Sequence, residues 1–339
     1  MTRRISFLIF SSVAVLAIFA FVWLWNRYPN ASLPEKVYKV GILIRGSGYE
    51  VAVDSYKRKM TELGYREGEN ISYDIRFVSA REELPRAVEE FLAEGTDLIH
   101  TYSTPATQAA YEITKTMPVP TPVVFGSVGD PLIAGVVRDF QHPGTNVTGV
   151  TSLSTELTAR RLELLYEMNP SAKRIAMPHT APENGDIAAT RSVEIAEETA
   201  RRLGMKLILL PVRAKEDNAT IAQRIMRQDA DGMIVGGDSL VWGDIDMYIA
   251  QAIREKIPFA AFDLNQVQKG ALLGFGPDIA ISGEQSAVIT HQILRGRSPA
   301  EIPVEVPRKL LLVINQATAR AIGIVFPDAF LQKADVVIE

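Results

Sequence analysis

Residues 97–125 read DLIHTYSTPATQAAYEITKTMPVPTPVVF and contain one complete strand–helix–strand unit. The apolar run at residues 97–102 predicts a short buried strand, residues 104–116 have the composition of a helix, and residues 122–125 predict a second strand. Two neighbouring strands that are connected by a helix run parallel in one sheet. This stretch therefore indicates an α/β fold with a parallel sheet.

The same alternation extends in both directions along the chain. The expected strands are residues 37–44, 71–78, 174–177, 206–212, 232–235, 258–262 and 271–276, and the expected helices are residues 49–63, 82–94, 187–203, 218–228, 245–256 and 279–294. These elements form two βα arrays of similar size, joined near residues 144–152. A Pro-rich run at 299–307 then leads into an extended segment at 310–315 that can cross back between them. The predicted fold class is α/β, with two doubly wound parallel-sheet lobes.

The N-terminal segment predicts a membrane anchor. Arg3 and Arg4 precede residues 5–25, which contain no charge, no Pro and no Gly. A helix of about 20 apolar residues spans the hydrocarbon core of a bilayer, and arginines before it favour a cytoplasmic N-terminus. The bulky end of the run favours an uncleaved transmembrane helix, and a signal peptide cleaved after Ala20 is the alternative. With residues 28–36 as a spacer, the body is expected to be extracytoplasmic, either tethered to the inner membrane or secreted.

Composition and motifs exclude several classes of function. The net charge of −4 gives no basic surface for nucleic acid. The absence of Cys excludes disulfides, thiol nucleophiles and a lipid-modified cysteine. The four histidines have no metal-ligand spacing, and no nucleophile elbow, phosphate loop or dinucleotide fingerprint occurs. We therefore expect a protein that is not an enzyme and has no cofactor or metal, in which His100 is a core histidine bonded to backbone.

The first candidate binding residues are Ser103 and Thr104. Ligands of open α/β sheets bind in the crevice at the carboxyl ends of the strands, and these two hydroxyls follow the strand at 97–102. They also begin a helix, where free backbone N–H groups and the helix dipole attract an anion. A carboxylate of the ligand is the expected partner. Plain N-capping of the helix is the alternative, and both roles are compatible.

Three acidic residues also follow strands in the expected cleft. Asp130, Asp238 and Asp263 each lie just beyond a strand, where a carboxylate can accept charge-assisted hydrogen bonds from a ligand ammonium. The alternative for Asp130 is turn chemistry with Pro131, and the alternative for Asp263 is the capping of a short helix.

Aromatic and hydroxyl side chains complete the candidate site. Tyr49 and Trp242 lie in or just after Gly-bearing loops and can offer flat faces to a ring, whereas Phe125 and Phe262 end strands and are expected in the core. Tyr102 is a further aromatic neighbour. The remaining candidate ligand-binding residues are Ser47, Ser127 and Ser239.

Several segments of the body carry a family resemblance. They are KVGIL (39–43), LGYREGEN (63–70), STPATQA (103–109), DP (130–131), PGTNVTGV (143–150), LVIN (312–315) and ADVVIE (334–339). Together they resemble the periplasmic substrate-binding component of a family of bacterial ABC transporters. The resemblance covers about residues 37–339, which is nearly the whole body.

This resemblance implies a type I periplasmic binding fold, in which two lobes joined by three hinge crossings close on a small molecule. It implies that lobe 1 comprises residues 37–149 plus about 277–310, and lobe 2 residues 150–276 plus about 311–339, after an N-terminal segment at 1–36. It further implies that Ser103 and Thr104 hold the ligand carboxylate beside the Asp130 loop, opposite Asp238 and Asp263. Members are linked to amino-acid uptake, aromatic in the best-defined cases. The chain departs from the family pattern in segments beside the expected pocket, at 118–122, 178–180 and 236–237, which leaves the ligand open.

The sequence thus predicts a membrane-tethered solute-binding protein of an ABC-type uptake system. It would capture a small carboxylate-bearing ligand, such as an amino acid, aromatic ones included, by hinge closure, and deliver it to permease and ATPase subunits. The alternative is a sensory module of the same fold that reports ligand occupancy to a partner kinase. Neither role involves nucleic acid.

Overall fold

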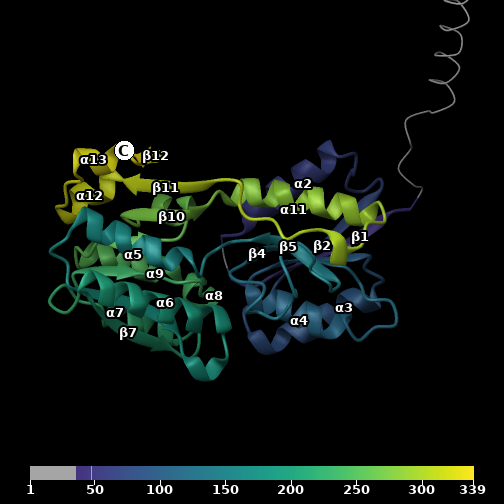
Figure 1. Cartoon of the computed structure of the whole chain (residues 1–339), viewed down its shortest axis with the longest axis horizontal. Coiled ribbons are helices and arrows are strands. Elements are labelled where there is room, and N and C mark those ends of the chain that lie inside the picture. The colour runs from purple at the N-terminus through teal and green to yellow at the C-terminus, as the bar shows by residue number, and fades with distance from the viewer. Residues whose placement is uncertain (1–35, 47) are drawn as a thin grey trace, which may run out of the picture. The chain divides into compact units, whose positions relative to one another are not determined.

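The computed structural model describes residues 36–46 and 48–339, of which Tyr38–Glu339 form one compact unit (Figure 1). The predicted membrane anchor, most of the spacer and the candidate residue Ser47 lie outside the described residues. Within the described ranges, none of the helices combines the length and the hydrophobicity that a membrane crossing requires.

The first lobe is built on a five-stranded sheet in which all neighbouring strands run parallel. Its strands are β1 (Tyr38–Ile44), β2 (Ile71–Phe77), β3 (Leu98–Tyr102), β4 (Val123–Val128) and β5 (Val147–Thr151), and its helices are α2 (Glu50–Glu62), η1 (Arg81–Glu83), α3 (Leu84–Ala93), α4 (Thr104–Thr114) and α11 (Ile279–Leu294). The strand order is β2-β1-β3-β4-β5. Helices α2 and α11 lie on one side of the sheet, and α3 and α4 on the other (Figure 1). The segment at 144–152, predicted to join the lobes, therefore contains an edge strand of this sheet.

The second lobe is built on a seven-stranded sheet in the order β12-β11-β10-β9-β8-β6-β7. Its strands are β6 (Arg174–Thr180), β7 (Lys206–Val212), β8 (Gly232–Ile234), β9 (Phe259–Ala261), β10 (Leu273–Pro277), β11 (Leu310–Asn315) and β12 (Val336–Ile338). Its helices are α5 (Leu157–Met168), η2 (Pro182–Asn184), α6 (Ile187–Leu203), α7 (Asp217–Gln223), α8 (Ser239–Trp242), α9 (Ile245–Arg254), α10 (Leu264–Gln268), α12 (Gln316–Ile322) and α13 (Asp328–Leu331). The α/β prediction with parallel sheets is confirmed, except that β10 and β11 pair antiparallel. The prediction of an entirely parallel sheet is wrong for this pair of strands. The reason is that β11 enters the sheet from the first lobe, at the same end where β10 leaves it.

The chain passes between the lobes three times, at residues 152–156, at Asp278, and at residues 302–309 after the 3-10 turn η3 (Pro299–Glu301). The first and third passages lie side by side, because Thr151 N donates to the Glu305 carbonyl oxygen at 3.0 Å. The extended segment that was expected to cross back between the lobes is therefore present and paired.

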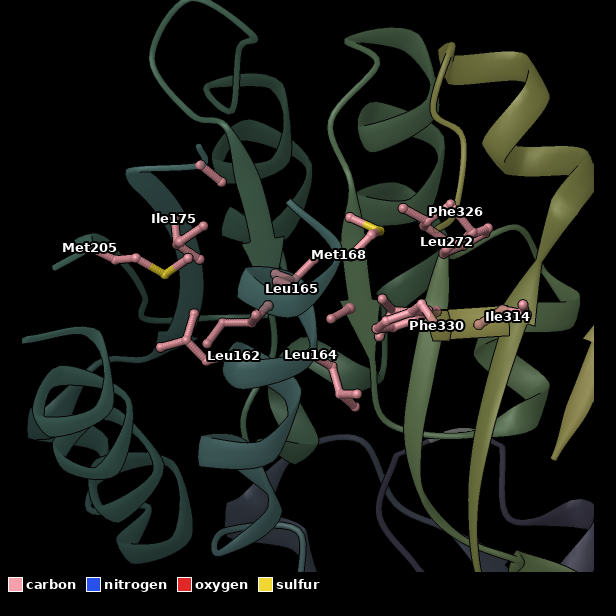
Figure 2. Close-up of a cluster of buried hydrophobic side chains, with 14 of the residues drawn as sticks. Leu162, Leu164, Leu165, Met168, Ile175, Met205, Leu272, Ile314, Phe326 and Phe330 are labelled. Carbon is pink, nitrogen blue, oxygen red and sulfur yellow. The ribbon is translucent and has the colours of Figure 1, made fainter. Parts of the chain in front are cut away.

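The core of the second lobe gathers around α5, a helix that the strand–helix pattern did not include. Leu162, Leu165 and Met168 recur every three residues and so lie on one face of the helix. They pack in a buried cluster with Ile175 of β6 and Phe330 of α13 (Figure 2). This packing fixes the start of α5, and with it the end of the first passage between the lobes.

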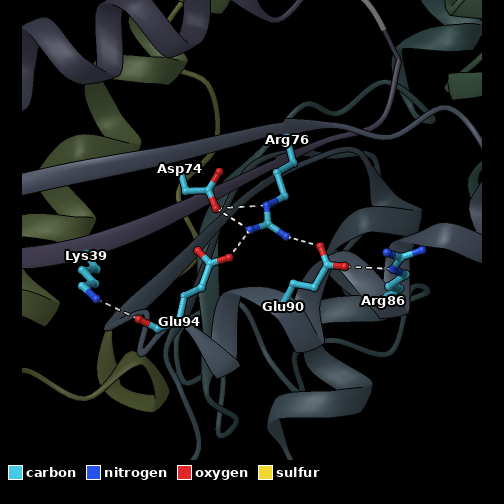
Figure 3. A network of polar contacts seen from close by, with 6 residues as sticks. All are labelled: Lys39, Asp74, Arg76, Arg86, Glu90 and Glu94. Carbon is cyan, nitrogen blue, oxygen red and sulfur yellow. Dashed lines mark hydrogen bonds and ion pairs between the residues drawn. The ribbon is translucent and has the colours of Figure 1, made fainter.

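In the first lobe, α3 is attached to β2 by one aromatic contact and an ion-pair network. The Arg76 guanidinium lies 4.5 Å from the centre of the buried Phe91 ring. It also pairs with Asp74 at 2.6 Å, Glu90 at 2.5 Å and Glu94 at 2.8 Å (Figure 3). The carboxylates are exposed, so each pair adds little stability. The network mainly fixes the direction of α3 on the sheet.

Helices α2 and α11 approach closely at Gly283. A Cβ atom at this position would clash with the carbonyl oxygen of Ala52 in α2. We expect Gly283→Ala to lower the free energy of unfolding by about 1–3 kcal/mol, because the two helices must separate to admit the methyl group. Urea denaturation of the full-length protein measures this change. Gly243→Ala is the control, since a Cβ there meets no atom closer than 3.5 Å. Equal stability of Gly283→Ala and the wild type would contradict this account of the packing.

Candidate functional site

A small cavity lies where loops at the strand ends of the two lobes meet, and we call it the inner chamber. Its volume is about 20 Å³. Its lining residues are Tyr49, Ser103, Thr104, Pro105, Ser127, Gly129, Ser152, Ser154, Asp186, Ala188, Gly237, Asp238, Ser239 and Trp242. All of them lie at the end of a strand, in the loop that follows it or in the first turn of the next helix, as expected for a ligand site of open α/β sheets.

The inner chamber brings together seven of the ten predicted site residues: Tyr49, Ser103, Thr104, Ser127, Asp238, Ser239 and Trp242. Asp263 lines an adjoining cavity that shares Tyr49 and Trp242 with the chamber. Asp130 lines neither cavity; its carboxylate accepts from the backbone N–H groups of Leu132 and Ile133, which is the turn chemistry named as its alternative.

Ser103 has a strained backbone at the start of α4. Its φ of 93° and ψ of 150° lie in a region that non-glycine residues rarely adopt, at a cost of about 1–3 kcal/mol. Its hydroxyl caps Ala106 N only weakly, at 3.4 Å, and the Thr104 hydroxyl accepts from Gly129 N at the same distance. Such strain persists where the surroundings hold it, and it is common at ligand sites. Both hydroxyls therefore retain capacity for a further partner at the positive end of α4.

The carboxylate of Asp238 is already occupied by the protein. It accepts from Thr180 N at 2.5 Å, from Thr180 Oγ1 at 2.7 Å, and from Leu240 N and Val241 N at 3.1 Å. Four donors leave little room for a ligand ammonium. Asp238 thus caps α8 and holds it against β6.

Asp263 is buried and caps α10, which is the alternative that the sequence left open. It accepts from Gln266 N at 2.9 Å. Burial raises the pKa of Asp263 to about 6. Its charge faces the smaller adjoining cavity rather than the inner chamber.

Asp186 is the acidic residue that sequence reasoning missed. It caps α6 by accepting from Ala189 N at 3.1 Å, and it is 5% exposed. Burial, followed by the charge of Asp238, raises the pKa of Asp186 to about 6. An acid before the helical run at 187–203 is a recognisable N-cap, but its place between the lobes depends on the fold.

Two aromatic pairs stand beside the inner chamber. The rings of Tyr49 and Tyr102 are 5.2 Å apart, and those of Trp242 and Phe262 are 4.4 Å apart. The indole N–H of Trp242 donates to the Gly236 carbonyl oxygen at 3.0 Å, so its ring is fixed in orientation. Burial raises the pKa of Tyr49 to about 12, which keeps its hydroxyl neutral. The chamber therefore has hydroxyl and carboxylate groups beside rigid apolar faces.

His100 lies in the core next to Tyr102, as predicted, but its predicted hydrogen bond to the backbone is absent among the described residues. In the part of the chain that the structure describes, neither of its ring nitrogens has a hydrogen-bond partner, so the expected bond to backbone is wrong. Its ring packs instead against Tyr56 at 4.6 Å and Tyr102 at 4.7 Å. Burial lowers the pKa of His100 to about 3, so it is neutral and acts as part of the core.

A larger cavity, the outer chamber, opens beside the inner one. Its volume is about 460 Å³. Its lining residues are Arg45, Ser79, Ala80, Arg81, Glu82, Thr180, Asn184, Asp186, Arg213, Ala214, Lys215, Glu216 and Leu240. Asp186 lines both chambers, so they adjoin at this carboxylate. Sequence analysis did not select the charged residues of the outer chamber, because no single loop contains them. Among residues 36–46 and 48–339, no group of three His, Asp or Glu side chains could hold a metal ion.

Comparisons with known proteins agree over nearly the whole body. Residues 39–338 match the protein family described as ABC transporter substrate binding protein. The chain is 28% identical to the "Tyrosine-binding protein" of Clostridioides difficile (strain R20291) over 295 residues, which are 85% of this chain and 81% of that relative.

Two solved structures have a similar fold. A conserved domain protein from Vibrio cholerae is 28% identical with a TM-score of 0.82, and the match covers 89% of this chain and 100% of that one. The structure described as the ABC domain in complex with L-Trp from Streptococcus pneumonia is 24% identical with a TM-score of 0.80, again over 89% and 100% of the two chains. The fold described above is thus the fold of these proteins.

Proposed function

This chain belongs to the ABC transporter substrate-binding protein family, whose members bind solutes, and we propose that it captures a small carboxylate-bearing ligand, an amino acid, between its two lobes. The observation that carries this proposal is the inner chamber. In it, the hydroxyls at the start of α4 in one lobe and the Asp186 carboxylate in the other line the same cavity. An α-amino acid has one anionic and one cationic group on the same carbon atom, which suits this pair of partners. The tyrosine-binding relative supports an amino acid as the ligand class.

We assign the ligand carboxylate to Ser103, Thr104 and the first N–H groups of α4. The ligand ammonium is assigned to Asp186, because Asp238 already accepts four hydrogen bonds and Asp263 lines a different cavity. Tyr49 and Trp242 would bound the ligand on its apolar side, with Ser127 and Ser239 as further hydroxyls. In this assignment Asp238 holds the second lobe in shape rather than contacting the ligand.

Binding would proceed by opening and closing of the lobes. The inner chamber, at about 20 Å³, has room for about one water molecule. An amino acid can therefore enter only when the lobes separate, and it would stabilise a more closed state by contacting both of them. We propose the lobe boundaries expected from the sequence, 37–149 plus about 277–310 and 150–276 plus about 311–339, moved by two residues at the first boundary so that β5 stays whole in the first lobe. The three passages would then act as the hinge.

The partners follow from this role. The loaded protein would be recognised outside the cytoplasm by a permease with its ATPase, while residues 5–25 anchor it to the inner membrane. The same anchor suits a sensory module, but no contact among the described residues favours that role.

Calorimetry on the full-length protein tests the proposal with L-tyrosine, L-tryptophan and other amino acids. We expect Thr104→Val to weaken binding by about 1–3 kcal/mol, roughly 5- to 150-fold, because the ligand carboxylate loses a hydroxyl donor. The matched control is Thr61→Val on the exposed surface of α2, which should bind like the wild type. If no amino acid binds, or if both variants bind like the wild type, the assignment is refuted.

A further inference from the structure

The outer chamber contains buried positive charge that the protein does not neutralise by direct ion pairs. Arg45 is 8% exposed, and its Nη1 donates to the Ser239 hydroxyl. Its Nε has no hydrogen-bond partner among the described residues, and within the same ranges no carboxylate lies within 4.0 Å of its guanidinium. Burial lowers the pKa of Arg45 from its ordinary value. A buried guanidinium with only a neutral acceptor is costly unless another anion reaches it.

Arg81, which is half-buried, is a second cation without a direct carboxylate partner among the described residues. Its Nη1 donates at 3.1 Å to the carbonyl oxygens of Asn184 and Gly185 in the other lobe. In the part of the chain that the structure describes, it forms no ion pair with a carboxylate. Arg213 lines the same chamber but is paired with Glu183 at 2.9 Å. Arg45 and Arg81 are therefore the two guanidiniums of the chamber that remain available to an anion.

The acidic residues near the chamber offset part of this charge: Asp186 and Asp238 favour the charged form of Arg45, although within the described ranges neither forms an ion pair with it. Glu82 and Glu216 are exposed, where water and salt screen their charge. Asp186 is buried, but its position at the junction of the two chambers is the one proposed for the ligand ammonium. The wall contributed by Arg45 and Arg81 thus keeps a positive potential toward the cavity.

The relative volumes show where a ligand side chain can lie. The inner chamber of about 20 Å³ is bounded by the fixed aromatic rings, whereas the outer chamber of about 460 Å³ is of the size that small-molecule pockets have. A ligand whose ammonium contacts Asp186 can extend its side chain into the outer chamber without moving these rings. The side chain would then meet Arg45 and Arg81 rather than an apolar surface.

We propose that the outer chamber is an oxyanion subsite and that the preferred ligand is an amino acid whose side chain ends in a carboxylate or a phosphate. This inference rests on the function proposed above and narrows its ligand class. Guanidinium groups bind both oxyanions through paired N–H donors, so the two chemistries share one subsite.

Calorimetry with matched ligand pairs on the full-length protein tests the subsite. L-Glutamate is compared with L-glutamine, which has nearly the same size but no terminal charge, and O-phospho-L-tyrosine is compared with L-tyrosine, which lacks the terminal phosphate. We expect at least one acid to bind ten times more tightly than its neutral partner, and the pair that shows this preference distinguishes carboxylate from phosphate. Arg81→Gln should lower the affinity for that acid by ten- to a hundredfold and the affinity for its neutral partner by less than threefold.

Two further variants make the test specific. Arg86→Gln removes an exposed arginine of α3 that is paired with Glu90 outside both chambers, and it should change neither affinity (Figure 3). Arg45→Lys keeps the positive charge but not the paired donors. It should lower the affinity for the acid more than the affinity for the neutral ligand. Neutral ligands that bind as tightly as the acids, unchanged by Arg81→Gln, would overturn the subsite and leave amino-acid capture standing. If none of these four ligands and no other amino acid binds to the protein, both proposals are refuted.

Discussion

Asp186→Asn is expected to weaken amino-acid binding by about 1.5–3 kcal/mol, a factor of about 10 to 150, while the protein stays folded. Of the two acids that line the inner chamber, Asp186 is the one that keeps an oxygen without a donor among the described residues, where its carboxylate accepts from Ala189 N in the cap of α6. Asparagine is an equally good cap, so the helix start is kept. What is lost is the charge that the ligand ammonium would meet.

The stability of this variant separates binding from folding. Burial raises the pKa of Asp186 above that of an ordinary aspartate, so between the two values the folded chain binds more protons than the unfolded chain. Stability from this group therefore falls as pH rises toward about 6, and at pH 7 the ionised carboxylate costs stability. Asp186→Asn removes that cost and should unfold at the same or higher urea concentration than the ligand-free wild type. A variant that binds weakly because it is destabilised would instead unfold at a lower urea concentration than the ligand-free wild type.

The affinity should also depend on pH in a characteristic way. With a pKa of about 6, Asp186 must lose a proton before it can hold an ammonium below that pH. The affinity of the wild type should therefore be nearly constant above about pH 7 and fall roughly tenfold between pH 7 and pH 5. Asp186→Asn should flatten most of this fall, with any remaining slope due to Asp263, whose pKa is also raised to about 6. Calorimetry across this range measures both profiles.

Asp139→Asn is the matched control for this prediction. Asp139 accepts from the backbone N–H groups of Gln141 and His142, and it lines neither chamber. Its replacement should leave affinity and its pH profile unchanged. Wild-type affinity in Asp186→Asn would show that the ammonium lies elsewhere.

Much of the fold could be predicted because its elements follow the local periodicity of the sequence. The helices at 187–203 and 279–294 and the strands at 206–212 and 310–315 begin and end where they were expected. The sequence did not predict β5, because Gly149 and its neighbouring threonines have the composition of a loop. The fold requires glycine there, since a Cβ would clash with the Phe125 carbonyl oxygen. The antiparallel direction of β11 depends on the long passage before it, which no local pattern encodes.

The candidate site was predictable in its position and less so in its chemistry. Hydroxyls that follow strands reach the crevice in any open α/β sheet, and Ser103 and Thr104 do so here. Which acid remains available is decided by the neighbours of each one. Asp238 accepts hydrogen bonds from Thr180, a residue 58 positions away, and Asp186 reaches the chamber because η2 turns the chain back toward it. Arg45 and Arg81 face the same cavity only through the pairing of β1 with the rest of its sheet and the turn at η1.

The largest expected loss of stability is that of Arg161→Ala, at about 3–5 kcal/mol. Arg161 of α5 is fully buried, and its Nη2 donates to the Ser154 carbonyl oxygen at 2.7 Å and to Thr158 Oγ1 at 3.0 Å. Its guanidinium also lies 5.2 Å from the centre of the Phe262 ring. Ser154 belongs to the first passage between the lobes, so this one side chain joins that passage to α5 and to the end of β9. Alanine would leave the Ser154 carbonyl oxygen with the Thr158 hydroxyl, at 3.1 Å, as its remaining side-chain donor, and it would open a cavity beside Phe262.

Comparison with Arg161→Met separates the charge from the volume. Burial lowers the pKa of Arg161 to about 9, which reflects the cost of keeping a charge away from water. Methionine fills most of the space without that charge, so Arg161→Met should be more stable than Arg161→Ala by about 2 kcal/mol or more, although it also loses the bond to Ser154. Arg160→Ala is the control, because the neighbouring side chain is partly exposed and pairs only with Glu163 and Glu167. It should change stability by less than about 1 kcal/mol.

Urea denaturation at pH 7 ranks the three variants. The order expected from least to most stable is Arg161→Ala, Arg161→Met and Arg160→Ala. If Arg161→Ala unfolded at the same urea concentration as Arg160→Ala, the guanidinium would not hold the passage to α5, and the hinge would have to be fixed by the pairing of Thr151 with Glu305 alone. If Arg161→Met matched the wild type, the lost hydrogen bonds would be offset by the removal of the buried charge, and Arg161 would contribute to the direction of the passage rather than to its stability.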